Sequence, residues 1–275
     1  MSSIESTETG ESWVHPLPAR LHKPIFALFL LLWGGELVRM GLHIAWPSGW
    51  EFLSPTVWML GSLTLAIGIY RRLPAQNVLS VVSLAALLGY LVELLNHATQ
   101  IPLGHRMFND RVGPVLAGVA WYQPWMWVAL AISGRGVARL ILRPWRKLQY
   151  YGLWVMAVAI GIALLTSIIY EPMGAHEGWW WRENLAGIWA WYGAPVASWL
   201  GWGMALLLIY GFTTPWFLNK KPVKQPTDWH PLWVWVLLLG WMTVSNCLHH
   251  SWLAVGVGSV IGVTVTFFAI RGGRW

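Results

Sequence analysis

The sequence predicts an all-α, polytopic membrane protein, and three observations support this fold class. Of the 275 residues, 56% are hydrophobic, only 11% are charged, and 24 are tryptophan. A soluble domain carries about 25% charged residues. Apolar segments of about 20 residues, long enough to cross a bilayer, recur along the whole chain. The composition excludes a disordered chain, a disulfide scaffold and a nucleic-acid-binding domain as descriptions of the whole protein.

Eight segments are long and apolar enough to span the roughly 30 Å of hydrocarbon in a bilayer. The second is short and the fourth contains Pro114 and Pro124, so a bundle of seven spans is the alternative. The predicted spans cover residues 24–45, 54–70, 77–97, 112–132, 150–170, 193–212, 230–248 and 252–270.

These spans form one transmembrane domain over residues 24–270, because no long polar linker separates them and no series of spans repeats at a fixed period. Residues 1–23 contain Glu5, Glu8 and Glu11 and lack the apolar core of a signal peptide. We expect them to form a polar cytoplasmic tail, and residues 271–275 to form a short C-terminal tail.

Basic residues gather on one side of the predicted bundle. Fourteen of the 18 Lys and Arg residues fall there, whereas Arg106, Arg111 and Arg182 fall on the other side and Arg39 lies within the first span. Cytoplasmic loops retain basic residues, so a multi-pass protein of the cell membrane with both termini in the cytoplasm is expected. This sorting accounts for the net charge of +7 without a nucleic-acid partner.

Ionisable residues within spans are costly and therefore suggest function. Glu36, Arg39 and His43 share one face of the first span, because their spacings of three and seven residues match the helical repeat. One interpretation is a catalytic role for Glu36. The alternative is an ion pair between Glu36 and Arg39 that neutralises both charges.

Glu93 and His97 lie one helical turn apart near the end of the third span. Apolar surroundings favour the neutral form of a carboxyl group, which can donate a proton near neutral pH. Glu93 is therefore a candidate general acid, and a polar cap at the helix end is the alternative. Glu171, Asn246, His249 and His250 end other spans on the same side, so a cavity near the outer interface is expected.

Metal and cofactor sites are not expected. Glu93 with His97 and the pair His249-His250 could supply ligands, but nine histidines are too few for the repeated clusters of membrane di-iron oxygenases. The glycine-rich loops that bind dinucleotides or phosphates are missing from the sequence. The single Cys247 excludes an internal disulfide and a cysteine-based metal site.

Tryptophans are dense between residues 179 and 202. Tryptophan is common at membrane interfaces, and a belt of this kind is one explanation. The other is a wall of flat, rigid rings that lines a groove for a polyene or isoprenoid chain. The segment contains Trp179, Trp180, Trp181, Trp189, Trp191, Trp199 and Trp202.

Two stretches carry a family resemblance. The first has Glu93, then ATQIPLG over residues 98–104 and GPVLAGV over residues 113–119. The second has Glu171-Pro172, then GWWW over residues 178–181 and YGAPVASWLGW over residues 192–202. In order and separation they resemble the membrane carotenoid biosynthesis proteins, a family that includes carotenoid 1′,2′-hydratases and bisanhydrobacterioruberin hydratases. Gln100, Leu103, Glu171 and Ser198 depart from the family's pattern.

The resemblance implies hydration of the terminal 1′,2′ double bond of an acyclic carotenoid within the bilayer. A proton added at C2′ gives a tertiary cation at C1′, which captures water. Glu93 would be the acid, Glu171 or His97 would position water, and Glu36 is a further catalytic candidate. Aromatic faces would stabilise the cation. The candidate substrate-binding residues are Trp179, Trp180, Trp181, Tyr192, Trp199, Trp202, Thr99 and Asn246.

Such a reaction needs neither a redox cofactor nor a nucleotide. Other carotenoid biosynthesis enzymes are candidate partners. Two alternatives stay open: another cation-based modification, such as cyclisation or isomerisation, and a non-enzymatic carotenoid-binding protein.

Overall fold

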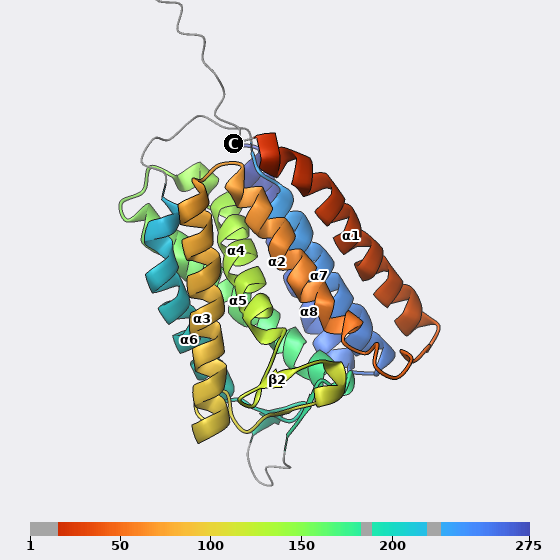
Figure 1. The fold of residues 1–275 in the computed structure, drawn as a ribbon. Coiled ribbons are helices and arrows are strands. Elements are labelled where there is room, and N and C mark those ends of the chain that lie inside the picture. Colours follow the sequence, from red (N-terminus) through yellow and green to blue (C-terminus); the bar gives the residue numbers. More distant parts are fainter. Residues whose placement is uncertain (1–15, 183–188, 219–226) are drawn as a thin grey trace, which may run out of the picture.

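The computed structural model describes residues 16–182, 189–218 and 227–275, and its described part is a bundle of eight α-helices (Figure 1). The predicted all-α membrane bundle is confirmed. Most of the expected N-terminal tail, with Glu5, Glu8 and Glu11, lies outside the described residues, as do Lys220, Lys221 and Lys224. The helices are α1 (Pro16–Gly41), α2 (Leu53–Tyr70), α3 (Ala75–Thr99), α4 (Gln123–Ile141), α5 (Tyr151–His176), α6 (Ser198–Thr213), α7 (His230–Leu248) and α8 (Trp252–Gly273).

Seven of these helices are long and apolar enough to cross a membrane, and α4 is the exception. Its position explains why. Helix α4 packs against α2, α3, α5, α7 and α8, and 14 of its 19 residues are buried. A helix that other helices surround does not need an apolar face toward lipid, so α4 can carry Arg135 and Arg139. Among the described residues there are thus eight helices, of which seven have the length and apolar composition of a membrane span.

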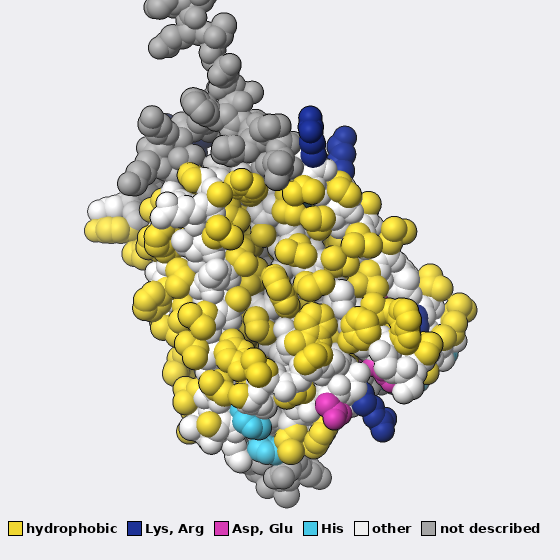
Figure 2. All heavy atoms as spheres, in the orientation of Figure 1, with side chains coloured by type: hydrophobic (Ala, Val, Ile, Leu, Met, Phe, Trp, Pro, Cys, Tyr) yellow, Lys and Arg dark blue, Asp and Glu magenta, His cyan; other side chains and the backbone are white. Residues whose placement is uncertain are grey.

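The outer surface of the bundle is apolar along the helices. Leu31, Leu200 and Val263 are each more than 70% exposed. Figure 2 shows hydrophobic side chains over the sides of the molecule and charged side chains mainly near its two ends. Large exposed apolar side chains in such numbers are costly in water and stable in lipid. The chain is a multi-pass membrane protein.

Three short antiparallel ladders close one end of the bundle, which we call the strand end and which comprises the described residues of 99–122 and 177–197 (Figure 1). Two ladders are hairpins, β2 (Val115–Leu116) with β3 (Val119–Ala120) and β5 (Ala190–Trp191) with β6 (Ala194–Pro195). The third joins two distant loops, because β1 (Met107–Phe108) pairs with β4 (Trp180–Trp181). These strands were not predicted, since two residues are too few to show an alternating pattern.

The strand end also shifts the start of two predicted spans. The span predicted from residue 193 begins at Ser198 of α6, because residues 193–197 belong to the β5–β6 hairpin and its flank. Residues 112–122 form the β2–β3 hairpin and its flanks, so the prediction that a span begins at residue 112 is wrong and α4 begins at Gln123. Pro124 is in the first turn of α4, where proline's missing N–H would have no helical partner.

The core of the bundle is rich in aromatic rings. Seven tryptophans are less than 2% exposed: Trp58, Trp127, Trp179, Trp180, Trp202, Trp235 and Trp241. They are too deeply buried to belong to an interfacial belt, whereas Trp189 and Trp252 are well exposed. The excess of tryptophan therefore serves both the interior and the surface.

Candidate active site

A buried cluster of two carboxylates and two guanidinium groups lies under the strand end. Arg106 Nη2 is 2.7 Å from Glu93 Oε2, and Arg106 Nη1 is 3.6 Å from Glu171 Oε1. Arg182 Nη2 is 2.8 Å from Glu171 Oε2. The four side chains are between 0% and 6% exposed. We call this group the carboxylate–arginine cluster.

The cluster balances its own charge. Two carboxylates face two guanidinium groups, and each carboxylate also accepts a hydrogen bond from an indole N–H: Trp127 to Glu93 at 3.4 Å and Trp202 to Glu171 at 3.0 Å. Removing ions from water costs several kcal/mol per ion unless good geometry and further hydrogen bonds compensate. Four ionised side chains well inside an apolar bundle therefore indicate function.

Local structure turns Arg106 back into the bundle. Gln100 ends α3 in the left-handed conformation, with φ of 62°. The side chain of Asn96 then holds the following loop against the helix, accepting from the Leu103 N–H at 2.7 Å and donating to the Gly104 carbonyl at 2.9 Å. Arg182 donates to the carbonyls of Leu103 and His105, so the second loop fastens the first.

Aromatic rings surround the Arg106 guanidinium. Its central carbon lies 5.1 Å from the centre of the Trp180 ring and 5.3 Å from that of Phe108. Burial alone would lower the pKa of this guanidinium, but the adjacent Glu93 and Glu171 carboxylates raise it above its ordinary value. Arg106 therefore stays charged, and its positive charge already covers a face of Trp180.

Several buried polar atoms beside the cluster make no hydrogen bond within the described part of the chain. They are Nε and Nη1 of Arg106, the Tyr122 hydroxyl and the Trp180 indole N–H. Buried polar groups are normally satisfied, so these atoms can bind a water molecule or a substrate hydroxyl.

Glu36 belongs to a second cluster, at the ends of α1, α5 and α7. Its carboxylate accepts from Arg39 at 3.0 Å and 3.1 Å and from Trp46 at 3.0 Å. The intrahelical ion pair expected as an alternative is thus present. Arg39 also contacts Glu177 at 3.2 Å, and Glu177 accepts from Ser245 at 2.6 Å.

The other predicted polar residues lie outside the carboxylate–arginine cluster. The His97 side chain is exposed and packs against Gly118 in the β2–β3 turn, while Glu93 bonds Arg106 and Trp127 instead. The Thr99 hydroxyl donates to the Leu95 carbonyl of its own helix and to the Ile101 carbonyl just beyond the helix end. Asn246 donates to the carbonyls of Ile169 and Met242, which ties α7 to α5.

The predicted aromatic residues divide into two groups. Trp179, Trp180 and Trp202 are buried next to the cluster, and Tyr170 contacts all three rings. In contrast, Trp181 is 50% exposed. Tyr192 and Trp199 are half-buried, and the ring of Tyr192 contacts His176.

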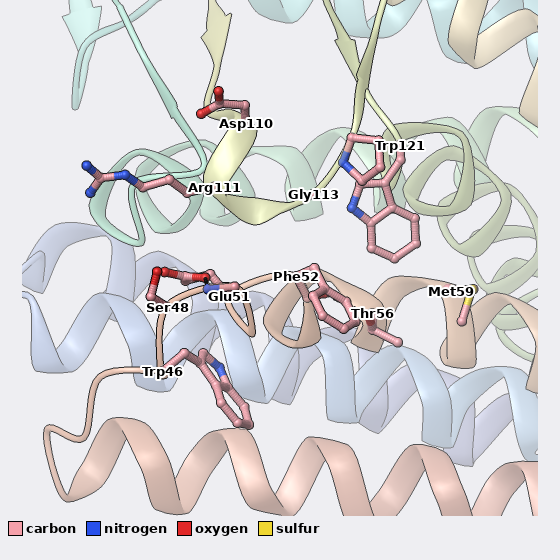
Figure 3. A pocket seen from close by; sticks show the side chains of 12 residues that line it. Trp46, Ser48, Glu51, Phe52, Thr56, Met59, Asp110, Arg111, Gly113 and Trp121 are labelled. Carbon is pink, nitrogen blue, oxygen red and sulfur yellow. Dashed lines mark hydrogen bonds between the residues drawn. The ribbon is translucent and has the colours of Figure 1, made fainter.

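An open pocket of about 1200 Å³ lies at the strand end, between the start of α2 and the loop that precedes α4 (Figure 3). Trp121, Phe52 and Met59 line its apolar part, and Glu51 and Asp110 line its polar part. None of the site residues predicted from the sequence is among its described lining.

Aromatic rings connect this pocket with the carboxylate–arginine cluster. Trp121 contacts Tyr122 with ring centres 6.3 Å apart, and Tyr122 contacts Phe108 at 6.4 Å. Phe108 in turn lies against Arg106. Packed rings therefore extend from the pocket wall to the Arg106 guanidinium.

Arg106, Arg182 and Trp127 were missed as site residues. Arg106 and Arg182 were assigned to outer loops, and only the scarcity of basic residues on that side could have drawn attention to them. Among the described residues, no group of three His, Cys, Asp or Glu side chains could hold a metal ion.

Comparison with known families gives one finding. The model of a family described as carotenoid biosynthesis protein matches residues 53–265. Neither the curated proteins nor the solved structures give a match. The matched residues include both carboxylates of the cluster, both arginines and both indole donors.

Proposed function

Because the chain belongs to the carotenoid biosynthesis protein family, we propose that it is an enzyme that hydrates the terminal 1′,2′ double bond of an acyclic carotenoid. The observation that supports this reaction is the buried pair of carboxylates joined by Arg106. Addition of water to an alkene needs a proton donor, a place for water and a negative charge near the developing cation. The cluster offers each of these.

Glu93 is the proposed proton donor. When Glu93 is protonated, the cluster contains two guanidinium groups and one carboxylate and carries one excess positive charge. Transfer of the proton to C2′ uses the π electrons of the alkene to form the new C–H bond and leaves a cation at C1′. The cluster then becomes neutral, and because charges interact strongly in apolar surroundings, this change favours proton transfer.

Water completes the proposed reaction at C1′. A water molecule held by the Tyr122 hydroxyl and Arg106 attacks the cation, and its surplus proton returns to the Glu93 carboxylate. Glu171 stays ionised throughout, because Arg106 and Arg182 both contact it. The rings of Tyr170, Trp179 and Trp202 supply electron-rich faces for the cation.

The charges of the cluster also bear on the non-enzymatic alternative. A protein that only carries a carotenoid needs an apolar groove, and four ionised groups in a bundle core would add cost without benefit to it. A cyclase or isomerase would use the same acid but would not incorporate water. The product mass therefore separates the remaining reactions.

Expression in cells that accumulate lycopene tests the proposal. The wild-type protein is expected to yield a product heavier by one water. Glu93→Gln removes the proton donor but keeps the side chain's size and an oxygen for Arg106, so product formation is expected to fall at least about 100-fold. Product mass and membrane protein level are measured together.

Asp228→Asn is the matched control. Asp228 lies on the loop between α6 and α7, at the end of the bundle opposite the strand end, and it pairs with Arg72. The variant is expected to keep wild-type product levels. A product with unchanged mass but altered chromatographic retention would mean that the enzyme isomerises or cyclises its substrate and does not hydrate it. Undiminished hydration by Glu93→Gln would remove Glu93 from the acid's role.

We also propose that both termini face the cytoplasm of the cell membrane. Arg71, Arg72, Arg139 and Arg143 lie at the end of the bundle opposite the strand end, where cytoplasmic loops retain basic residues. A fluorescent protein fused after Trp275 is expected to fluoresce, and alkaline phosphatase fused there is expected to be inactive. An active phosphatase and a dark fluorescent fusion would reverse the orientation.

A further inference from the structure

Residues 75–127 and 151–202 contain the same structural features, in an order that differs only in the place of one short strand. Each segment begins with a long helix that carries a glutamate near its end, Glu93 on α3 and Glu171 on α5. An arginine that bonds this glutamate follows in the next loop, Arg106 or Arg182. Each loop also contains a short strand, which follows Arg106 in unit 1 and precedes Arg182 in unit 2. A hairpin with a two-residue turn and a second helix complete each segment. We call the segments unit 1 and unit 2.

The hairpins and the indole donors match in detail. The turn residues have φ values of 49° and 80° at Ala117-Gly118 and 47° and 83° at Tyr192-Gly193, as in a type I′ turn. Nine residues after each glycine comes the tryptophan that donates to the glutamate of the same unit, Trp127 in unit 1 and Trp202 in unit 2.

Equivalent elements of the two units contact each other. Strand β1 directly follows Arg106, and strand β4 directly precedes Arg182. The two strands pair antiparallel with each other. The rings of Trp127 and Trp202 lie 4.5 Å apart. Helix α3 packs on both α4 and α6, and α5 likewise packs on both α6 and α4. The carboxylate–arginine cluster lies where the two units meet.

The symmetry is broken at the charged groups. Arg106 contacts both glutamates, whereas Arg182 contacts Glu171 and two backbone carbonyls. Within the described part of the chain, Glu171 therefore has two guanidinium partners and Glu93 has one. The indole hydrogen bond is also longer at Glu93, 3.4 Å against 3.0 Å at Glu171.

The surroundings of the two units also differ. Unit 1 contains a 3-10 turn, Asp110–Val112, which borders the pocket together with Trp121. The residues of unit 2 at the same distance from its hairpin glycine, 185–187, lie outside the described residues. Trp121 comes three residues after the hairpin glycine Gly118. The residue three positions after the corresponding glycine of unit 2, Gly193, is Val196. The pocket is thus lined by a tryptophan of unit 1 at a position where unit 2 has a valine.

We propose that the reaction centre is a duplicated carboxylate–arginine–tryptophan unit whose copies have different tasks. In unit 1, Glu93 exchanges the proton and Trp127 positions its carboxylate. In unit 2, Glu171 is the permanent counter-ion, fixed by Arg182 and Trp202. This division rests on the proposed function only in requiring that one carboxylate changes its protonation state.

Infrared spectroscopy of the full-length protein in lipid vesicles tests the division without any carotenoid. A buried glutamate that gains a proton shows a carbonyl stretching band that its ionised form lacks. As pH falls, the wild type is expected to gain one such band. The band is expected to be absent in Glu93→Gln and present in Glu171→Gln. The charged and titratable groups near Glu93 are Arg106, Glu171, Tyr122 and Tyr170.

A matched pair of tryptophan variants provides the second arm. Trp127→Phe removes the indole donor to Glu93 and is expected to move the midpoint of the band upward by about one pH unit, because the carboxylate loses a hydrogen bond that favours its charged form. Trp202→Phe removes the donor to Glu171 and is expected to leave the midpoint in place.

The division would be overturned if Glu171→Gln removed the band and Glu93→Gln kept it, or if Trp202→Phe moved the midpoint and Trp127→Phe did not. Equal effects of the two glutamate variants, or of the two tryptophan variants, would also overturn it. The Trp127→Phe arm decides the question if Glu93→Gln does not fold. A failure of the proposed hydration reaction is recognised separately, from the mass of the carotenoid product. If cells show no water gain in the carotenoid while the infrared pattern is as expected, the proposed reaction fails and the division of tasks stands.

Discussion

Replacing Arg106 by methionine is expected to lower the free energy of unfolding by about 3–5 kcal/mol, because removal of one partner leaves a buried charge without compensation. Glu93 would lose the one guanidinium partner that it has among the described residues, and Glu171 would keep Arg182. The measurement is thermal or denaturant unfolding in detergent, with carotenoid turnover measured in parallel. Turnover is expected to disappear, since the aligned carboxylates and the proposed water site both depend on Arg106.

Arg111→Met is the matched control, because Arg111 lies in the same loop and is exposed. It is expected to change stability by less than about 1 kcal/mol, as surface substitutions usually do. Adding Glu93→Gln to Arg106→Met removes the unpaired charge and is expected to restore part of the lost stability. A double variant no more stable than Arg106→Met would contradict the ion-pair explanation.

Gly174→Ala on α5 is the second large effect. A Cβ at this position would lie 1.8 Å from Cη2 of Trp180, a ring that is buried against Tyr170 and Arg106. A rigid indole in a packed core cannot yield this space cheaply, so a loss of about 3 kcal/mol in stability is expected, at the upper end of overpacking effects. Displacing Trp180 also moves the ring that supports Arg106, so turnover is expected to fall as well.

Gly161→Ala provides the comparison on the same helix, since no atom outside the helix lies within 4 Å of a Cβ built there. Alanine is the better helix former, so this variant is expected to be as stable as the wild type or slightly more stable. Unfolding and near-ultraviolet circular dichroism of both variants in detergent check the contrast. Equal stability of the two variants would mean that Trp180 moves aside freely.

The class of fold and two members of the cluster could be predicted from the sequence. Apolar segments reveal membrane helices because the bilayer core accepts little else. Glu93 and Glu171 attract attention for the same reason, since carboxylates are rare at that depth. Their partners Arg106 and Arg182 could not be placed, because a basic residue between two spans looks alike whether its loop lies in water or folds back into the bundle.

The internal pair of units escaped detection for a related reason. Glu93 and Glu171 are 78 residues apart, but Gly118 and Gly193 are 75 apart, because the loops of the two units differ in length. A search for a fixed period therefore finds nothing. What the units share is a set of contacts, and contacts between a helix and a returning loop leave no regular pattern in the sequence.

The central position of α4 has a consequence for how the protein is made. A segment with Arg135 and Arg139 gains little from entering lipid alone. Helix α3 precedes it and can shield one side, but α5, α7 and α8 cover the rest and are synthesised later. During translation, α4 must therefore be retained beside the translocon or at the membrane surface until those helices arrive. Membrane integration and folding of this protein are thus one coupled process.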